Sequence, residues 1–517
     1  MAVVLNSIPP SNNRLPNPGN RFRDYQNQHC IIQRADGILS YDPLKRRALA
    51  IPPEITAEIF LNCLPDETFI PPNSKQAPLV LCHVCRQWRI IAFNTPGLWA
   101  SLYVDYNWFE YPGLDDLLCG WLSRSGDLPL KLRIDESNTY CIQPGVKLLD
   151  DQLDAVLSMV GELSARWQHI WFSVFPDALE LLFPSGAKFP RLNNLTVELA
   201  SEYSYEDPRF PIAFYGYPPY VLQDAHSLQE VQFLQAPWWT LSIPPTSLTT
   251  YTSERLRASE CLEVLRSSVN LTKASFGLIP PDPDSSNKHI FPRSSYPKVC
   301  DLTLSERLEF VHSPLVAMEL LRHLTFPSLK NFALSFEAGE DHPSGDISEL
   351  IFFATRSLRR LEKLTLCFLP TLEMGLLQCL QGFSSINTLQ LQLRTSMNEL
   401  VIRLTYDKDF LPRLQSMHIV YAPCSWHPAN RVYRGPSSDS VLEMLLTRWY
   451  PSELVAGRAR LQSFQLDLDD HAPTALDGMN LFTALALSDP RYQQLRDAGM
   501  CILFKKAEPY NTWYVEY

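Results

Sequence analysis

The stretch LEKLTL at residues 361–366 carries the pattern that decides the fold of this 517-residue chain. Leu361, Leu364 and Leu366 form a frame in which two spacers separate the first pair of apolar residues and one spacer separates the second pair. The last two leucines alternate with polar residues, so they predict a short strand with one buried face. Leu361 is expected to pack into the turn that leads to this strand.

The same frame recurs along the chain, which indicates internal repetition. Further matches lie at Leu192/Leu195/Val197, Leu228/Val231/Phe233, Leu271/Ala274/Phe276, Val299/Leu302/Leu304, Leu329/Phe332/Leu334, Ile386/Leu389/Leu391, Leu414/Met417/Ile419 and Leu461/Phe464/Leu466. So many matches are difficult to attribute to chance. A weaker frame lies at Leu248/Tyr251, and earlier strands are suggested by Leu130/Leu132/Ile134 and Ile170/Phe172/Val174.

The segments between the frames can return as helices. Apolar periodicity predicts helices at residues 117–125, 153–167, 254–267, 350–357 and 441–450. One strand with one helix cannot bury its own apolar face, so neighbouring repeats are expected to stack into a curved α/β solenoid with a concave strand face. This organisation resembles an irregular leucine-rich-repeat array, with repeats spaced from about 20 to more than 40 residues apart.

The two ends of the chain differ from the repeats. Residues 492–498 predict a helix that stops at Gly499, and residues 500–504 predict a final strand that covers the open edge of the array. Residues 1–42 have little periodicity and are expected to be mostly unstructured. The predicted organisation is an N-terminal extension (1–47), a small all-helical module (48–104), repeats (105–475) and a capping segment (476–517).

The helical module is predicted from residues 51–102. Proline and glutamate in Ile51-Pro52-Pro53-Glu54 suit the first turn of a helix. A second helix is predicted from the apolar stripe Leu81, Val84, Cys85, Trp88, Ile91 and Ala92. Thr95-Pro96 predicts the start of a short third helix that carries Leu98 and Trp99.

These segments, namely Ile51-Pro52-Pro53-Glu54-Ile55, Val84-Cys85-Arg86-Gln87-Trp88-Arg89 and Thr95-Pro96-Gly97-Leu98-Trp99, resemble the F-box of many fungal proteins. The resemblance covers about a tenth of the chain. Ile51 stands where the family usually has leucine, and the loop from Pro65 to Pro78 is longer than in short F-boxes.

The resemblance implies a substrate-recognition adaptor of a cullin-based ubiquitin ligase. In such proteins the F-box binds a Skp-type adaptor, which bridges to cullin, and the repeats hold a target protein. The positions that the resemblance assigns to Skp binding are Pro52, Pro53, Ile55, Ile59, Leu81, Val84, Cys85 and Trp88. A module of this size has a poor surface-to-volume ratio, so a partner would cover its remaining apolar surface. The alternative is a helical cap on the array, which seals its own apolar stripes.

Target binding is predicted where aromatic residues gather between frames. Tyr205, Phe214 and Tyr217 lie in a proline-rich insertion, and Trp238 and Trp239 follow it. Aromatic side chains supply large, rigid contact areas at interfaces. An insertion folded over its own core would explain the same residues.

Composition and motifs exclude several other functions. The net charge is −11 without long basic runs, so nucleic acid and membrane surfaces are not expected partners. Twelve scattered cysteines favour free thiols in the cytoplasm or nucleus.

No catalytic, cofactor or metal motif is evident. Cys82 and Cys85 lack a second pair, and two further groups, His418/Cys424/His427 and Asp467/Asp469/Asp470/His471, do not form a recognisable site. The predicted function is therefore a non-enzymatic adaptor. The alternative is a scaffold or sensor that has the same repeats but a helical module that binds another partner.

Overall fold

The computed structural model describes residues 51–105, 113–136, 151–199, 220–222, 224–235, 241–280, 292–308, 315–338, 345–357, 360–394, 396–421, 436–450, 458–468 and 488–506. The chain divides into two compact units, residues 1–228 and 229–517. Both units are mixed α/β, and their main strands pair in parallel. The predicted α/β class is therefore confirmed.

The first unit begins with a helical module made of α3 (Pro53–Leu61), α4 (Leu79–Val84), α5 (Arg86–Phe93) and the 3₁₀ helix η1 (Pro96–Trp99). The prediction of one continuous second helix is wrong. Cys85 has φ −159° and ψ 169°, and this extended residue separates α4 from α5. Its Sγ accepts a hydrogen bond from the Trp88 N–H at 3.4 Å, so the cysteine caps the new helix.

Aromatic residues connect this module to the first repeat. Trp99 and Trp121 are buried and meet edge to face at a centroid distance of 5.0 Å. Trp99 Nε1 donates to the Ala92 carbonyl at 2.8 Å, and Trp121 Nε1 donates to the Ser101 carbonyl at 3.1 Å. The helices and the start of the sheet therefore share one core.

The sheet of the first unit has the strand order β1 (Ser101–Asp105), β2 (Leu130–Asp135), β3 (Trp167–Val174) and β4 (Asn194–Leu199). The Tyr103 N–H donates to the Ile70 carbonyl at 2.9 Å, so the loop before α4 covers part of the β1 edge. The helical segments between these strands are α7 (Leu114–Arg124), α8 (Asp151–Glu162), η2 (Ser164–Arg166) and α9 (Ala178–Leu182). The short strand β5 (Tyr220–Val221) follows.

The second unit repeats the arrangement with a longer sheet. Its strand order is β6 (Glu230–Leu234), β8 (Thr250–Leu256), β9 (Lys273–Leu278), β11 (Asp301–Leu308), β13 (Asn331–Ala338), β14 (Lys363–Cys367), β15 (Thr388–Leu393), β16 (Ser416–Tyr421), β17 (Ser463–Leu468) and β18 (Cys501–Lys506). Short elements β7 (Leu241–Ser242), η5 (Pro245–Ser247), β10 (Ser294–Ser295) and β12 (Leu324–Thr325) lie between them. Every residue of the nine predicted frames is buried, which confirms the core that the frame predicts.

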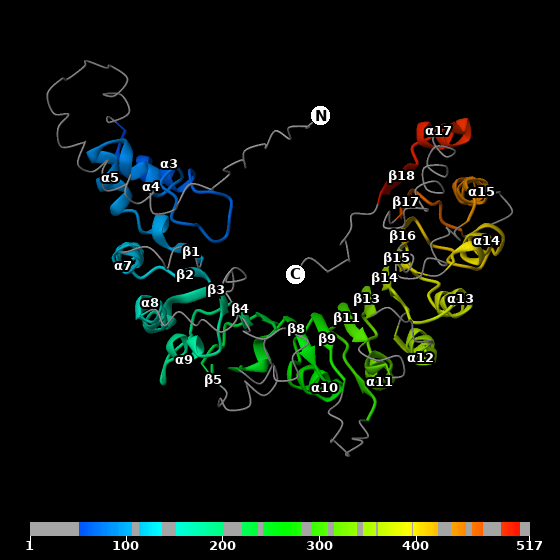
Figure 1. Ribbon diagram of the computed structural model, residues 1–517, viewed down its shortest axis with the longest axis horizontal. Helices are drawn as coiled ribbons and strands as arrows, with labels where there is room; N and C mark the ends of the chain where they lie inside the picture. The colour runs from blue at the N-terminus through cyan, green and yellow to red at the C-terminus, as the bar shows by residue number, and fades with distance from the viewer. Residues whose placement is uncertain are drawn as a thin grey trace, which may run out of the picture. The chain divides into compact units, whose positions relative to one another are not determined.

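Helices cover one face of this sheet (Figure 1). They are α10 (Ala258–Ser267), α11 (Val316–His323), α12 (Ser348–Ser357), α13 (Glu373–Gln381), α14 (Asn398–Tyr406), α15 (Ser438–Trp449) and α17 (Pro490–Asp497). The predicted helix at 254–267 begins late, because residues up to Leu256 extend β8 and pair with β9 across a bulge. Gly277 in β9 lies under that bulge, where a Cβ would approach the Glu254 carbonyl oxygen too closely.

Backbone hydrogen bonds at the entry to each strand fix its register. One carbonyl accepts two consecutive N–H groups from the next repeat, at distances of 2.7 to 3.1 Å. The accepting residues, here called the entry residues, are Gln229, Thr249, Thr272, Cys300, Lys330, Glu362, Asn387 and Gln415. Because each entry residue after Gln229 also donates its own N–H to the one before it, the bonds continue from β6 to β17.

The C-terminal end matches its prediction. Gly499 ends α17 with φ 98°, and the Met500 N–H donates to the Leu495 carbonyl at 3.0 Å. The next residues form β18, which pairs with β17.

In the part of the chain that the structure describes, every helix is too short or too polar to cross a membrane.

Candidate partner-binding site

The helical module leaves several apolar side chains uncovered. Ile55, Ile59, Val84 and Ile90 are 54%, 46%, 57% and 52% exposed, and Ile51 and Phe93 are also exposed. We call the four isoleucine and valine residues named first the module surface. The core beneath them is closed, since Phe60, Leu98 and Trp99 are almost completely buried. The exposed side chains of the module surface are therefore not needed to build this core.

Helix α3 presents two residues of the module surface. Ile55 and Ile59 are four residues apart and share one side of the helix. Thr56 and Phe60 occupy the buried side, and the Phe60 ring packs edge to face on Trp88 at 4.9 Å. Pro52 and Pro53 precede them at the exposed start of the helix. The proline-led start thus orients α3 with its isoleucines outward.

The break at Cys85 orients Val84 and Ile90. Helix α4 buries Leu79, Leu81 and Cys82, while Val84 lies at its exposed end. Arg89 Nε donates to the Cys82 carbonyl at 2.7 Å, which satisfies a free carbonyl at the end of α4 and holds α5 against it. In α5 the buried pair Ile91 and Ala92 leaves Ile90 on the outer side.

The residues that the F-box resemblance assigns to Skp binding divide by exposure. Pro52, Pro53, Ile55, Ile59 and Val84 are exposed, whereas Cys85 and Trp88 are partly buried. Leu81 is only 6% exposed and belongs to the core of the module. Leu81 therefore does not contribute to the exposed surface of the module, because it lies on the buried side of α4.

Ile90 and Phe93 are exposed residues that the sequence interpretation did not select. They belong to the apolar run Ile90-Ile91-Ala92-Phe93. A helix that buries one side only must expose part of such a run, so the run itself was the available signal. The charged residues exposed on the module have both signs, with Glu54 and Glu58 on α3 and Arg86 on α5.

The predicted target-binding residues Tyr205, Phe214, Tyr217, Trp238 and Trp239 lie outside the described residues. The same holds for Cys424 and His427, and for Asp469, Asp470 and His471. These interpretations therefore stay predictions.

Cys82 and Cys85 of the module have structural contacts. Cys82 is buried, its Sγ donates to the Pro78 carbonyl, and burial raises the pKa of its thiol to about 11. Cys85 Sγ accepts the Trp88 N–H. In the second unit, the His418 ring on β16 is hydrogen-bonded to the Asp467 carboxylate on β17 at 2.8 Å. Among the described residues, no three His, Cys, Asp or Glu side chains gather in a way that could hold a metal ion.

Comparison with known proteins gives no match. No protein-family model matches this sequence, and no curated protein matches it significantly. The site must therefore be interpreted from its own geometry.

Proposed function

We propose that this chain is a substrate-recognition adaptor of a cullin-based ubiquitin ligase. In this proposal the helical module is an F-box that binds a Skp-type adaptor, and the repeats form a leucine-rich-repeat solenoid that holds a target protein. The observation that carries the proposal is the module surface, where four apolar side chains are about half exposed although the module has a closed core.

Burial of this surface would provide the free energy of docking. Each aliphatic side chain that passes from half exposed to buried contributes on the order of 1 kcal/mol. The mixed charges around it do not select a strongly charged partner, so shape and apolar contact would determine specificity.

The link between module and sheet supports the second part of the proposal. The Trp99–Trp121 contact and the Tyr103–Ile70 hydrogen bond join the helices to β1 and α7. A target on the first repeats would therefore keep a fixed position relative to the docked adaptor. The chain would perform no bond chemistry itself, and it would raise the effective concentration of a target lysine at the charged ubiquitin carrier.

Co-purification from cell lysate tests this proposal directly. The wild-type chain is expected to capture both a Skp-type adaptor and cullin. Val84→Asp combined with Ile90→Asp should reduce adaptor capture about tenfold or more, because a charge would be buried at the contact. Both positions are exposed, so the variant should retain the thermal stability of the wild type.

Val269→Asp is the matched control, since Val269 is 61% exposed and lies outside the module. Equal adaptor capture by the double variant and by this control would discard the F-box assignment. Capture of the adaptor without cullin would instead support a scaffold function.

A further inference from the structure

Basic side chains gather where four neighbouring strands of residues 229–517 begin. The strands β9, β11, β13 and β14 are consecutive in the sheet and parallel, so they begin at the same edge. The segments that lead into them, here called entry segments, are residues 268–273, 292–301, 324–331 and 360–363. Each entry segment contributes at least one exposed lysine or arginine. We call these six residues the basic edge, namely Lys273, Arg293, Lys298, Lys330, Arg360 and Lys363.

Acidic residues do not balance the basic edge. The same four entry segments contain two carboxylates, Asp301 and Glu362. Asp301 is half-buried and accepts a hydrogen bond from the Asn331 side chain. Glu362 lies 3.9 Å from Lys330, and both side chains are more than half exposed, so water weakens this ion pair. Positive charge therefore dominates here, although the whole chain has a net charge of −11.

The neighbouring helices add positive charge at this edge. Helices α10, α11 and α12 carry Arg266, Arg322 and Arg356 in their last turns, where the helix dipole favours a cation. Arg322 pairs with Glu349 at 3.0 Å. Burial lowers the pKa of Arg356, and the nearby charge of Arg293 lowers it further. The six residues of the basic edge lie outside these helices, so the helix dipoles do not account for them.

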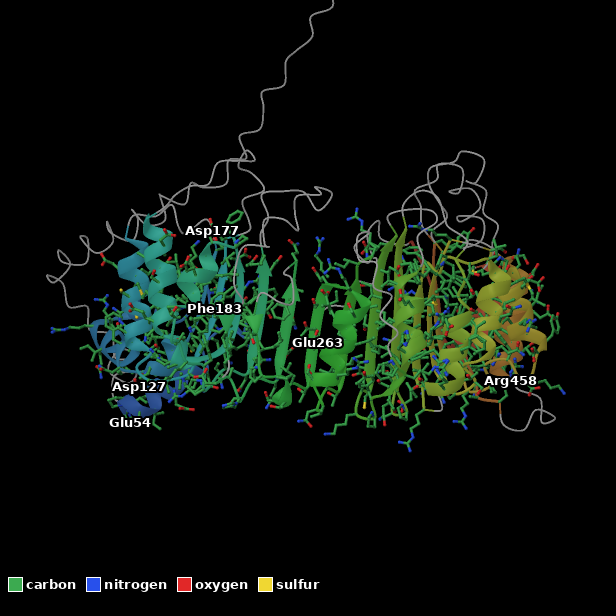
Figure 2. All side chains as sticks on the ribbon, turned by 90° about the horizontal axis from the view of Figure 1, so that it is seen from below. Glu54, Asp127, Asp177, Phe183, Glu263 and Arg458 are labelled. Atoms are coloured by element: carbon green, nitrogen blue, oxygen red, sulfur yellow. The ribbon has the colours of Figure 1, made fainter. Side chains whose placement is uncertain are left out.

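The basic edge has clear limits. The entry segments of β8 and β15, residues 243–250 and 382–388, contain no charged residue. The next row on the open face of the four strands is also uncharged and consists of Ser275, Thr303, Ala333 and Thr365. The exposed acid Glu263 lies on the middle of α10, away from the edge at which Arg458, in the loop before β17, is found (Figure 2).

The dimensions of the basic edge fit a single extended chain. Neighbouring strands are about 4.8 Å apart, so four strands span about 15 Å, a length that about five residues of an extended chain cover. An anionic membrane is a much broader surface, and it would repel the rest of a chain whose net charge is −11. A short run of carboxylates meets only the basic edge.

The aromatic residues of the entry segments favour a protein over a nucleic acid. Single-stranded nucleic acids are bound by combining basic residues with exposed aromatic rings on which the bases stack. The described residues of the four entry segments include two aromatic side chains, Tyr296 and Phe326. Phe326 is buried, and Tyr296 is half-buried against it at a centroid distance of 5.7 Å. These rings therefore serve packing and do not form a platform for bases.

We propose that the basic edge binds an acidic segment of a partner protein, in which Asp or Glu residues recur along an extended chain. Its carboxylates would pair with Lys273 and Lys363 at the two ends of the edge and with Lys330 between them. Lys298 is already held in place, since its Nζ donates to Asn270 Oδ1 at 2.6 Å, and this neutral amide leaves the charge of the lysine available. The proposal goes beyond the adaptor function and does not depend on Skp binding.

Fluorescence anisotropy with the full chain tests the proposal. The first probe is a labelled peptide of about ten residues in which Glu and Ser alternate, so that its carboxylates lie on one side of an extended chain. A matched peptide carries Gln at every Glu position. The wild-type chain is expected to bind the Glu peptide about tenfold or more tightly than the Gln peptide. This affinity should fall as the salt concentration rises. A labelled oligouridine of similar length is the second probe and should bind more weakly than the Glu peptide.

Charge reversal locates the binding site. Lys273→Glu with Lys363→Glu should weaken binding of the Glu peptide about tenfold or more, because both ends of the basic edge would repel it. The matched control reverses two exposed basic residues elsewhere, Arg307→Glu at the other end of β11 and Lys505→Glu on β18. Both variants change the net charge equally, and the control should bind like the wild type. All four positions are exposed, so both variants should retain the thermal stability of the wild type.

Three outcomes would overturn the proposal. Equal affinity of the wild type for the Glu and Gln peptides would exclude recognition of carboxylates. Equal affinity of Lys273→Glu/Lys363→Glu and the matched control would exclude the basic edge. Tighter binding of the oligouridine than of the Glu peptide would assign the basic edge to nucleic acid. The Val84→Asp/Ile90→Asp variant should still bind the Glu peptide, so failure of the adaptor function is distinguishable from failure here.

Discussion

The strand layer and the helix layer of residues 229–517 are held together by different groups. Adjacent strands are connected by backbone groups, because one entry-residue carbonyl accepts two N–H groups from the next repeat. The helices are connected by individual charged side chains, such as Arg356, Arg448 and Glu373. At its entry residues the strand layer should therefore tolerate side-chain replacement, whereas the helix layer should depend on a few residues.

Arg448 shows this dependence most clearly. It is buried on α15, and its guanidinium donates to the carbonyls of Leu404, Phe410 and Leu411 at 2.7 to 2.9 Å. Leu411 has φ 48°, a conformation that is unfavourable for leucine. Burial lowers the pKa of Arg448 to about 9, so the guanidinium remains charged at neutral pH. One side chain thus secures the end of α14 and the turn that follows it.

The largest effect is expected from Arg448→Met. Methionine retains much of the packing volume but removes three hydrogen bonds from a buried charged group, so the free energy of unfolding should fall by about 3–5 kcal/mol. The Leu404 carbonyl keeps a hydrogen bond from Arg458 and the Leu411 carbonyl keeps one from the Leu414 N–H, whereas the Phe410 carbonyl loses its side-chain donor. Chemical denaturation measures the change. Arg413→Met, at an exposed position, is the control and should have little effect. A loss no larger than in this control would contradict the dependence of the helix layer on Arg448.

An intermediate effect is expected from Glu306→Gln and should depend on pH. Glu306 is buried on β11 and accepts the N–H groups of Val316 and Ala317 at the start of α11, both at 2.8 Å. Burial raises the pKa of its carboxyl group from 4.5 to about 7, although these two hydrogen bonds oppose the rise. Between pH 4.5 and about pH 7, Glu306 binds a proton in the folded state but not in the unfolded state. Its contribution to the free energy of unfolding therefore becomes less favourable as the pH rises through this window.

Glu306→Gln should remove this contribution, which is at most about 3 kcal/mol across the window. The measurement is the free energy of unfolding from pH 5 to pH 8, compared between wild type and variant. Glu337→Gln on β13 is exposed and serves as the control. If the wild type and Glu306→Gln followed parallel pH curves, the buried carboxyl group would not titrate in this window.

The smallest effect is expected from Glu362→Ala in the strand layer. The Glu362 carbonyl accepts the N–H groups of Asn387 and Thr388, while its side chain is 56% exposed and lies 3.9 Å from Lys330. Alanine keeps the backbone bonds, so the loss should be below about 0.5 kcal/mol. Glu362→Pro removes the N–H that donates to the Lys330 carbonyl and should cost about 3 kcal/mol or more. Equal losses would show that the side chain, and not the backbone, fixes the register.

This difference between layers explains which parts of the fold were predictable from sequence. The frame residues are apolar at every repeat because each must be buried, so the strands could be located. The entry residues include Gln, Thr, Cys, Lys, Glu and Asn, since only their backbone is used. No side-chain pattern marks these positions, and the register bonds could therefore not be predicted.

The helices were less predictable for a related reason. Helices α13 and α14 were not singled out, because Met374 and Ile402 place apolar groups on their outer sides and obscure the one-sided pattern. In the module, the sequence could not indicate that Cys85 is extended, so the outward position of Val84 and the burial of Leu81 became evident only from the structure.

The double hydrogen bond at each entry residue also bears on how such a chain can change its length. The first paired residues of neighbouring strands are as near in sequence as Glu230 and Thr250 or as far apart as Ser416 and Ser463, yet both pairs of strands are parallel and in continuous register. Since a strand is positioned at its first residues, extra chain can be accommodated before the next entry without displacing the sheet. Evolution could therefore enlarge or shorten individual loops while the scaffold stays constant.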